Sequence, residues 1–185
     1  MACLLLNFTD IDIFVTKGFF MSDTNNTIIS KNFLEICVQI EERCTALYDF
    51  YSDIYEDIPD ASFLWNKTAR ANENHQKQFE LALRLLSETE FEVSKASLSR
   101  AYTIQTNLIQ FMEYIKNNKP GILTAVSKAV ELEEILAELH VQSSLNFKDK
   151  SMHNLFKAMS KSDYDPVAAL RLYWTILYLP ECEIN

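Results

Sequence analysis

The chain is very poor in the residues that make tight turns. It has 2 glycines and 4 prolines among 185 residues. β-Hairpins, glycine-rich phosphate loops and the dinucleotide-binding fingerprint all depend on such residues. Hydrophobic residues make up 48% of the chain, which is enough to build the core of one domain. We therefore expect a single all-α domain, and the composition argues against β and α/β folds.

The charge of the chain argues against nucleic acid and anionic membranes as partners. Acidic residues outnumber basic ones by 26 to 17, which gives a net charge of −9. Such a surface repels a phosphate backbone and lacks the basic patches of nucleic-acid-binding proteins. No stretch approaches the ~18 uncharged apolar residues that a membrane span requires.

The cysteines indicate a reducing environment. No C-x-x-C pair occurs among Cys3, Cys37, Cys44 and Cys182, which argues against a zinc knuckle or a rubredoxin-type iron centre. Cys37 and Cys44 are seven residues apart and would share a helix face. We expect them to be buried free thiols, with a redox pair as the alternative. A cytoplasmic location is predicted.

The chain is predicted to contain one domain with short extensions. Residues 1–28 are expected to be an N-terminal extension, residues 29–180 the helical domain and residues 181–185 a tail. Two aspartates interrupt the apolar run near the N-terminus and Lys17 follows it, so a signal peptide is disfavoured. Met21 precedes a polar run and is an alternative start of the protein.

Apolar residues that recur every three or four positions predict five helical stretches. Asp60 or Ser62 is expected to cap the second stretch, and Asp165-Pro166 is expected to break the last one. The stretches cover about 32–57, 60–87, 96–117, 122–143 and 151–179. Two pairs of long helices joined by a long connection predict a four-helix bundle with one crossover, and the middle stretch adds a connecting helix.

The first and fourth helical stretches resemble each other. Residues 38–48 align with residues 130–140, so that Glu41 lies over Glu133 and Tyr48 over His140. The helical period turns Glu41 and Glu133 toward the apolar face of their helices. The glutamate that follows each of them points away from that face. Each helix is therefore predicted to send one glutamate inward.

The second and last stretches repeat more weakly, with Asn72 over Asp163 and His75 over Pro166. Asn72, His75 and Asp163 share the apolar faces of their helices. Together with the two glutamates they form an inward polar set drawn from four helices. Buried carboxylates are costly unless a cation, a proton or a hydrogen-bond donor compensates them. A bound metal is one solution, and protonation with hydrogen bonds from Tyr48, Asn72 and His75 is the other.

These motifs resemble the rubrerythrin branch of the ferritin-like superfamily. The resemblance rests on residues 40–48, on residues 64–75 and on the repeat of the first motif around Glu133, and it covers roughly residues 32–178. It implies a ferritin-like four-helix bundle. In that family a glutamate from each of two helices and a Glu-x-x-His from each of the other two hold a di-iron site. The resemblance therefore implies Glu41, His75, Glu133 and Asp163 as metal ligands.

Two departures from the family pattern limit the inferred function. Asn72 stands where the pattern has a glutamate, and Pro166 stands where it has the second histidine. Proline cannot ligate a metal and can bend the helix that carries Asp163. The second half of the site is therefore expected to have lost its geometry. His140, two helical turns from Glu133, is not expected to bind the same ion.

The leading hypothesis is a rubrerythrin-like bundle with a degenerate site that is non-catalytic or weakly binds a single divalent metal. A metal-free bundle is the favoured outcome, and iron is the first choice if a metal is bound. The alternative is a di-iron peroxidase or oxidase in which Asp163 and water complete the site, which would need an external electron donor. A partner-binding bundle is a third option. Ferritin-like bundles commonly dimerise, so a homodimer is one expectation. Trp65, Trp174 and Tyr178 are candidates for its contacts, although burial in the core is the favoured fate of each.

Overall fold

The structure is a computed structural model that describes residues 23–182, with side chains described for 26–179. The predictions for Met21, Cys3 and most of the N-terminal extension lie outside these residues. The described chain is all-α, as the scarcity of glycine and proline predicts. Its helices are α1 (Asp23–Ile54), α2 (Pro59–Arg84), α3 (Lys95–Asn117), α4 (Ile122–Asn146), α5 (Lys150–Ser162) and α6 (Tyr164–Cys182).

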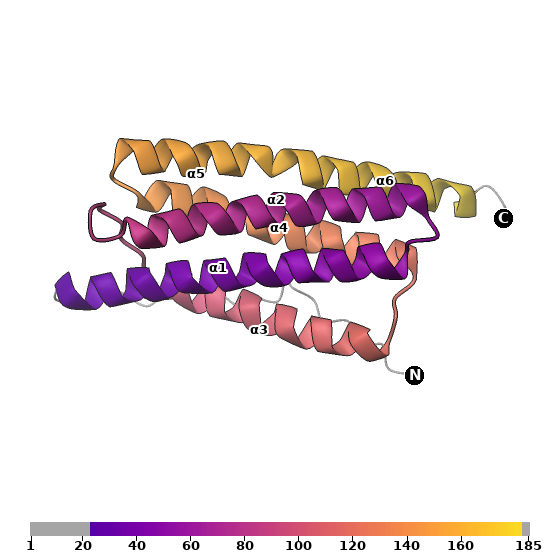
Figure 1. The fold of residues 1–185 in the computed structure, drawn as a ribbon, viewed down its shortest axis with the longest axis horizontal. Helices are drawn as coiled ribbons and strands as arrows, with labels where there is room; N and C mark the ends of the chain where they lie inside the picture. The colour runs from indigo at the N-terminus through magenta and orange to yellow at the C-terminus, as the bar shows by residue number, and fades with distance from the viewer. Residues whose placement is uncertain (1–22, 183–185) are drawn as a thin grey trace.

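The helices pack side by side as a bundle (Figure 1). α1 and α2 form one hairpin, and α4 forms a second hairpin with α5 and α6, which follow each other along one rod. α3 connects the two hairpins in the sequence, lies against α1 on the outside of the bundle and runs in the same direction as α1. As a result, α2 and α4 run in the same direction and α1 and α4 run in opposite directions.

Two boundaries of the first hairpin differ from the prediction. α1 begins at Asp23, well before residue 32, and its buried face extends upstream of Phe33 to Ile29 and Ser30. α2 begins at Pro59 after Ile58, and neither Asp60 nor Ser62 caps it. Proline suits this first position, since its fixed φ is helical and the missing N–H would have no partner there.

The last rod is interrupted at Asp163, and not at Asp165-Pro166 as expected. Asp163 ends α5 with a helical backbone, and its carbonyl accepts a hydrogen bond from the Val167 N–H at 3.3 Å. Pro166 therefore lies in the first turn of α6, where a residue without an N–H is tolerated. Pro166 has no N–H to donate to the carbonyl of Ser162, one turn earlier. The helix is therefore interrupted upstream of the proline.

Aromatic and aliphatic side chains fill the space between the hairpins. Trp65 is fully buried and its ring stacks on Tyr48 at 5.9 Å between centroids. Cys37 and Cys44 are buried free thiols, as predicted. Tyr178 is 45% exposed, so its expected burial is wrong, and it stacks on the half-buried Trp174.

The loops at one end of the bundle are tied together. The segment between α2 and α3 forms a β-bridge with the segment between α4 and α5 through Phe91 and Phe147, whose rings stack at 4.2 Å. The Ser30 hydroxyl of α1 donates to the Phe91 carbonyl at 2.9 Å. Among the described residues, no helix has the length and apolar character needed to span a bilayer.

Candidate metal centre

The polar side chains predicted to point inward are all buried. Glu41, Asn72, His75, Glu133 and Asp163 are each at most 3% exposed. They come from α1, α2, α4 and the junction of α5 with α6. The exposed partners Glu42 and Glu134 point outward, as helical phase predicts. In the structure these side chains belong to two separate groups, one of which also includes His140 and the other Tyr48.

The first group consists of Glu41, His75, His140 and Asp163. Both ring nitrogens of His140 are engaged: Nε2 lies 2.9 Å from Glu41 Oε1, and Nδ1 lies 2.9 Å from Asp163 Oδ2. The His75 ring lies beside the His140 ring, with centroids 4.8 Å apart and an edge-on orientation. His75 Nδ1 is 3.7 Å from Glu41 Oε2, and His75 Nε2 is 3.3 Å from Asp163 Oδ1. Two carboxylates thus enclose two imidazoles.

Two fully buried atoms of this group lack a hydrogen bond. Glu41 Oε2 and His75 Nδ1 are buried, and neither has a hydrogen-bond partner among the described residues. An unsatisfied buried polar atom costs about 1–3 kcal/mol. One ligand atom each from Glu41, His75 and His140 lies within 4.8 Å of the other two. These three side chains could therefore hold a metal ion.

The second group consists of Glu133, Tyr48 and Asn72. The Tyr48 hydroxyl donates to Glu133 Oε1 at 2.7 Å, and the Asn72 amide donates to the same oxygen at 3.2 Å. Hydrogen bonds from Tyr48 and Asn72 are part of the metal-free alternative that the sequence predicts for stabilising a buried carboxylate. Burial and the nearby charge of Glu133 raise the pKa of Tyr48 well above its ordinary value, so Tyr48 remains a donor.

The two groups follow from the repeat and from the opposite directions of α1 and α4. Glu41 faces His140, and seven residues further along α1 Tyr48 faces Glu133. Each glutamate therefore contacts the ring that lies seven residues after the other glutamate. The exchange is reciprocal, as expected for two similar helices that pack antiparallel.

His140 is the residue whose role the sequence analysis missed. It lies two turns from Glu133 on α4, which predicts that the two do not share an ion and leaves His140 outside the predicted ligand set. In the structure His140 instead contacts Glu41 and Asp163 across the bundle. The signal was present in the repeat: the equal Glu-to-ring spacing in both helices predicts such pairing once the helices are taken as antiparallel.

The break in the last rod does not remove Asp163 from the site, contrary to the expectation for the second half-site. Asp163 is 3% exposed and reaches both histidines. Pro166, which stands in the register position of His75, lines a surface pocket instead.

Charge sets the protonation of the first group. Burial opposes a charged His140, but the negative charge of Glu41 and the hydrogen bonds to Asp163 and Glu41 outweigh it and raise the pKa of His140 to about 10. Burial likewise opposes a charged Glu41, yet the charge and hydrogen bond of His140 lower its pKa. Without a metal, a proton on His140 thus supplies positive charge between the two acids.

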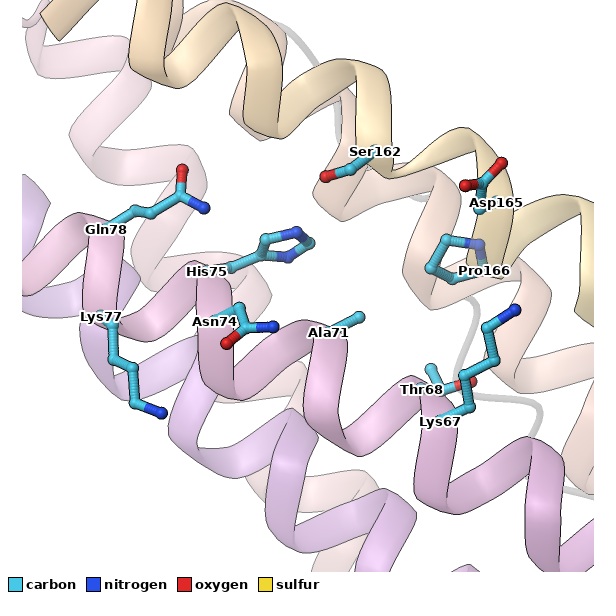
Figure 2. Close-up of a pocket in the computed structure, with 10 residues that line it drawn as sticks. All are labelled: Lys67, Thr68, Ala71, Asn74, His75, Lys77, Gln78, Ser162, Asp165 and Pro166. Carbon is cyan, nitrogen blue, oxygen red and sulfur yellow. The ribbon is translucent and has the colours of Figure 1, made fainter.

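A pocket of about 540 Å³ reaches the cluster from the surface (Figure 2). It lies between α2 and the junction of α5 with α6. The small side chains of Thr68, Ala71 and Ser162 line it, and the ring of His75 points into it from α2. His75 is the residue that belongs both to the pocket lining and to the buried cluster.

Comparisons of the chain with protein-family models, with curated proteins and with solved structures gave no significant match. The function of the protein is therefore inferred from the geometry of the cluster.

Proposed function

We propose that this protein is a divalent-metal-binding bundle that holds one ion between Glu41, His75 and His140. The observation that carries the proposal is the facing pair of Glu41 Oε2 and His75 Nδ1, both buried and both without a hydrogen-bond partner in the described chain. A cation between them would satisfy both atoms. It would also neutralise a cluster that has two carboxylates.

The spacing of these atoms supports an ion better than a hydrogen bond. Their separation of 3.7 Å exceeds the range of a hydrogen bond. Metal–ligand bonds of about 2.1 Å place neighbouring ligand atoms about 3.0–3.4 Å apart in octahedral and tetrahedral geometry. Glu41 Oε1 and His140 Nε2 are 2.9 Å apart. The three ligand atoms lie within 4.8 Å of one another, so small side-chain movements would bring all three to one ion.

The ligand types define the class of metal. Two imidazoles and one carboxylate suit Fe(II), Zn²⁺ and Mn²⁺, and they leave coordination positions for water. His140 binds through Nε2, so the proton that it shares with Glu41 is released when the ion enters. Iron is the first candidate, because the sequence resembles a di-iron family.

The arrangement favours one ion over a di-iron centre. A second iron would need Glu133 as a ligand, but Tyr48 and Asn72 occupy its Oε1. It would also need a ligand at the position of Pro166. We propose a ferritin-like bundle with a degenerate site, supported by the two hairpins, the intervening α3 and the reciprocal pairing of α1 with α4. The proposed role is metal binding without catalysis.

Metal analysis of the purified protein tests the proposal. After reconstitution with Fe²⁺, Zn²⁺ or Mn²⁺ in turn, we expect one ion per chain for at least one metal. Glu41→Gln and His75→Ala should lose it, while the exposed Glu42→Gln should retain it as a matched control. Two irons per chain with an oxo-bridge absorption band would support the di-iron alternative. Failure of wild type to bind any of the three ions would overturn the proposal.

A further inference from the structure

We infer that Asp163 is a positioning residue that holds both histidines from the side opposite the metal, and not a fourth ligand. This inference rests on the proposed function. It departs from the ligand set implied by the family resemblance, in which Asp163 binds the ion.

The four distances around the two rings carry the inference. Glu41 faces Nε2 of His140 and Nδ1 of His75. Asp163 faces the other nitrogen of each ring, with Oδ2 at 2.9 Å from His140 Nδ1 and Oδ1 at 3.3 Å from His75 Nε2. The two acids therefore lie on opposite sides of the histidine pair. An ion held with Glu41 lies on the side away from Asp163.

The two nitrogens of an imidazole ring have different roles when the ring binds a metal. A ring binds a metal through one nitrogen and keeps a proton on the other, and that N–H needs an acceptor. Asp163 offers one oxygen to each ring. With a metal bound, the hydrogen bond to Asp163 Oδ2 would keep the proton of His140 on Nδ1, and the nearby Asp163 Oδ1 would favour the proton of His75 on Nε2. The lone pairs of His140 Nε2 and His75 Nδ1 then point toward Glu41, where the ion is proposed.

The backbone around Asp163 keeps its carboxylate in this place. Its N–H donates to the Met159 carbonyl at 3.3 Å, and its carbonyl accepts from the Val167 N–H at 3.3 Å. Asp163 is thus anchored to both α5 and α6 at the break in the rod. Its side chain is 4% exposed, so water competes little for its oxygens.

Tautomer assignment by NMR tests the inference directly. The chain has three histidines, and His153 lies outside the cluster and serves as an internal reference. In the Zn²⁺-loaded protein labelled with ¹⁵N, we expect a metal-bound Nε2 and protonated Nδ1 for His140, and a metal-bound Nδ1 and protonated Nε2 for His75. The opposite tautomer at either ring would overturn the inference. This measurement needs no variant.

Asp163→Asn provides the second test. Loss of an outer carboxylate typically weakens metal binding about 10- to 100-fold while the ligands remain. We therefore expect one Zn²⁺ per chain, a Kd raised by about that factor, and an unchanged number of nitrogen and oxygen neighbours by X-ray absorption. Loss of one oxygen neighbour would show that Asp163 is a ligand, and an unchanged Kd would show that it has no role. Both results contradict the inference but leave the proposed function intact, whereas wild type that binds no metal contradicts the proposed function itself.

Discussion

Glu41 and Glu133 occupy equivalent positions of one repeat, yet their surroundings give them opposite proton affinities. Both are buried. Glu41 lies against His140, and the positive charge and hydrogen bond of that ring outweigh burial and lower its pKa. Around Glu133, burial is the largest effect, the Tyr48 hydrogen bond only partly offsets it, and the pKa rises to about 7. The identity of the facing ring, histidine or tyrosine, separates an ionised acid from one that is half protonated at neutral pH.

Glu133 should make the bundle less stable as the pH rises. Its folded pKa of about 7 is above its ordinary value of 4.5, so its contribution is favourable below pH 4.5 and is lost as pH rises through 7. Glu133→Gln keeps an acceptor for Tyr48 and never ionises. We expect the variant to exceed wild type by roughly 3 kcal/mol in the free energy of unfolding at pH 8 and to match it closely near pH 4.5. Urea denaturation of the metal-free proteins at both pH values measures this.

The control for that experiment is Glu134→Gln, which changes the exposed neighbour on the same helix. It should show no comparable gain at pH 8. A stability difference between Glu133→Gln and wild type that is the same at both pH values would contradict the raised pKa of Glu133.

For each helix, the sequence predicts which residues face the core better than it predicts how far along a neighbouring helix their contacts lie. The 3.6-residue period identifies the inward residues of α1, α2 and α4, and burial confirms them. Periodicity within one helix does not say which residue of a neighbour lies opposite. That depends on helix direction and on the length of the loops. For this reason Glu133 was expected at the same ion as Glu41, whereas the position facing Glu41 belongs to His140.

Local chemistry also explains the errors at helix ends. Pro166 predicts a break at its own position, but proline is tolerated in the first turn of a helix, and the break falls three residues earlier at Asp163. This small difference matters for the site. A break at Pro166 would leave Asp163 inside a regular helix, whereas the observed break places it where two helices meet.

The interface between α2 and the α5–α6 rod should control how fast metal reaches the site. The pocket there has His75 in its lining, and Ala71 is one of the small side chains that keep it open. Ala71→Leu should fill part of the pocket and slow Zn²⁺ uptake in stopped-flow measurements, with the equilibrium Kd unchanged, because no proposed ligand is altered. Ala46→Leu, on the exposed face of α1, is the matched control. Equal uptake rates in the two variants would argue for another route.

The start of α4 offers a test of helix capping that is independent of metal. Gly121 occupies the N-cap with an extended backbone (φ −68°, ψ 153°), and an added Cβ would meet nothing within 4 Å. Gly121→Ser should supply the missing side-chain acceptor and reduce the freedom of the unfolded chain, which together stabilise by roughly 0.5–1.5 kcal/mol. Ser94→Ala, which removes the existing cap of α3, should destabilise by about 1 kcal/mol. Thermal unfolding of both variants checks the two signs, and a Gly121→Ser protein that melts below wild type would contradict the expected cap.

The proposed ion joins the two hairpins of the bundle. Glu41 and His75 belong to the first hairpin and His140 belongs to the second. These residues are distant in sequence, so the complete ligand set exists only in the folded bundle. Metal binding should therefore stabilise the fold by about 2.7 kcal/mol when free metal is 100 times its Kd.

The stabilisation by metal should grow as the pH rises. The ion and a proton compete for Nε2 of His140, whose pKa in the metal-free bundle is raised to about 10. Below that pH, each unit of increase makes the deprotonated ring about ten times more abundant and should tighten binding by a similar factor. At a fixed Zn²⁺ concentration, we expect a larger rise in Tm at pH 8 than at pH 6. His75→Ala should show little rise at either pH, because one of the three ligands is lost. A rise in wild type that is equal at both pH values, or larger at pH 6, would mean that the ion does not displace the His140 proton and binds elsewhere on the acidic surface.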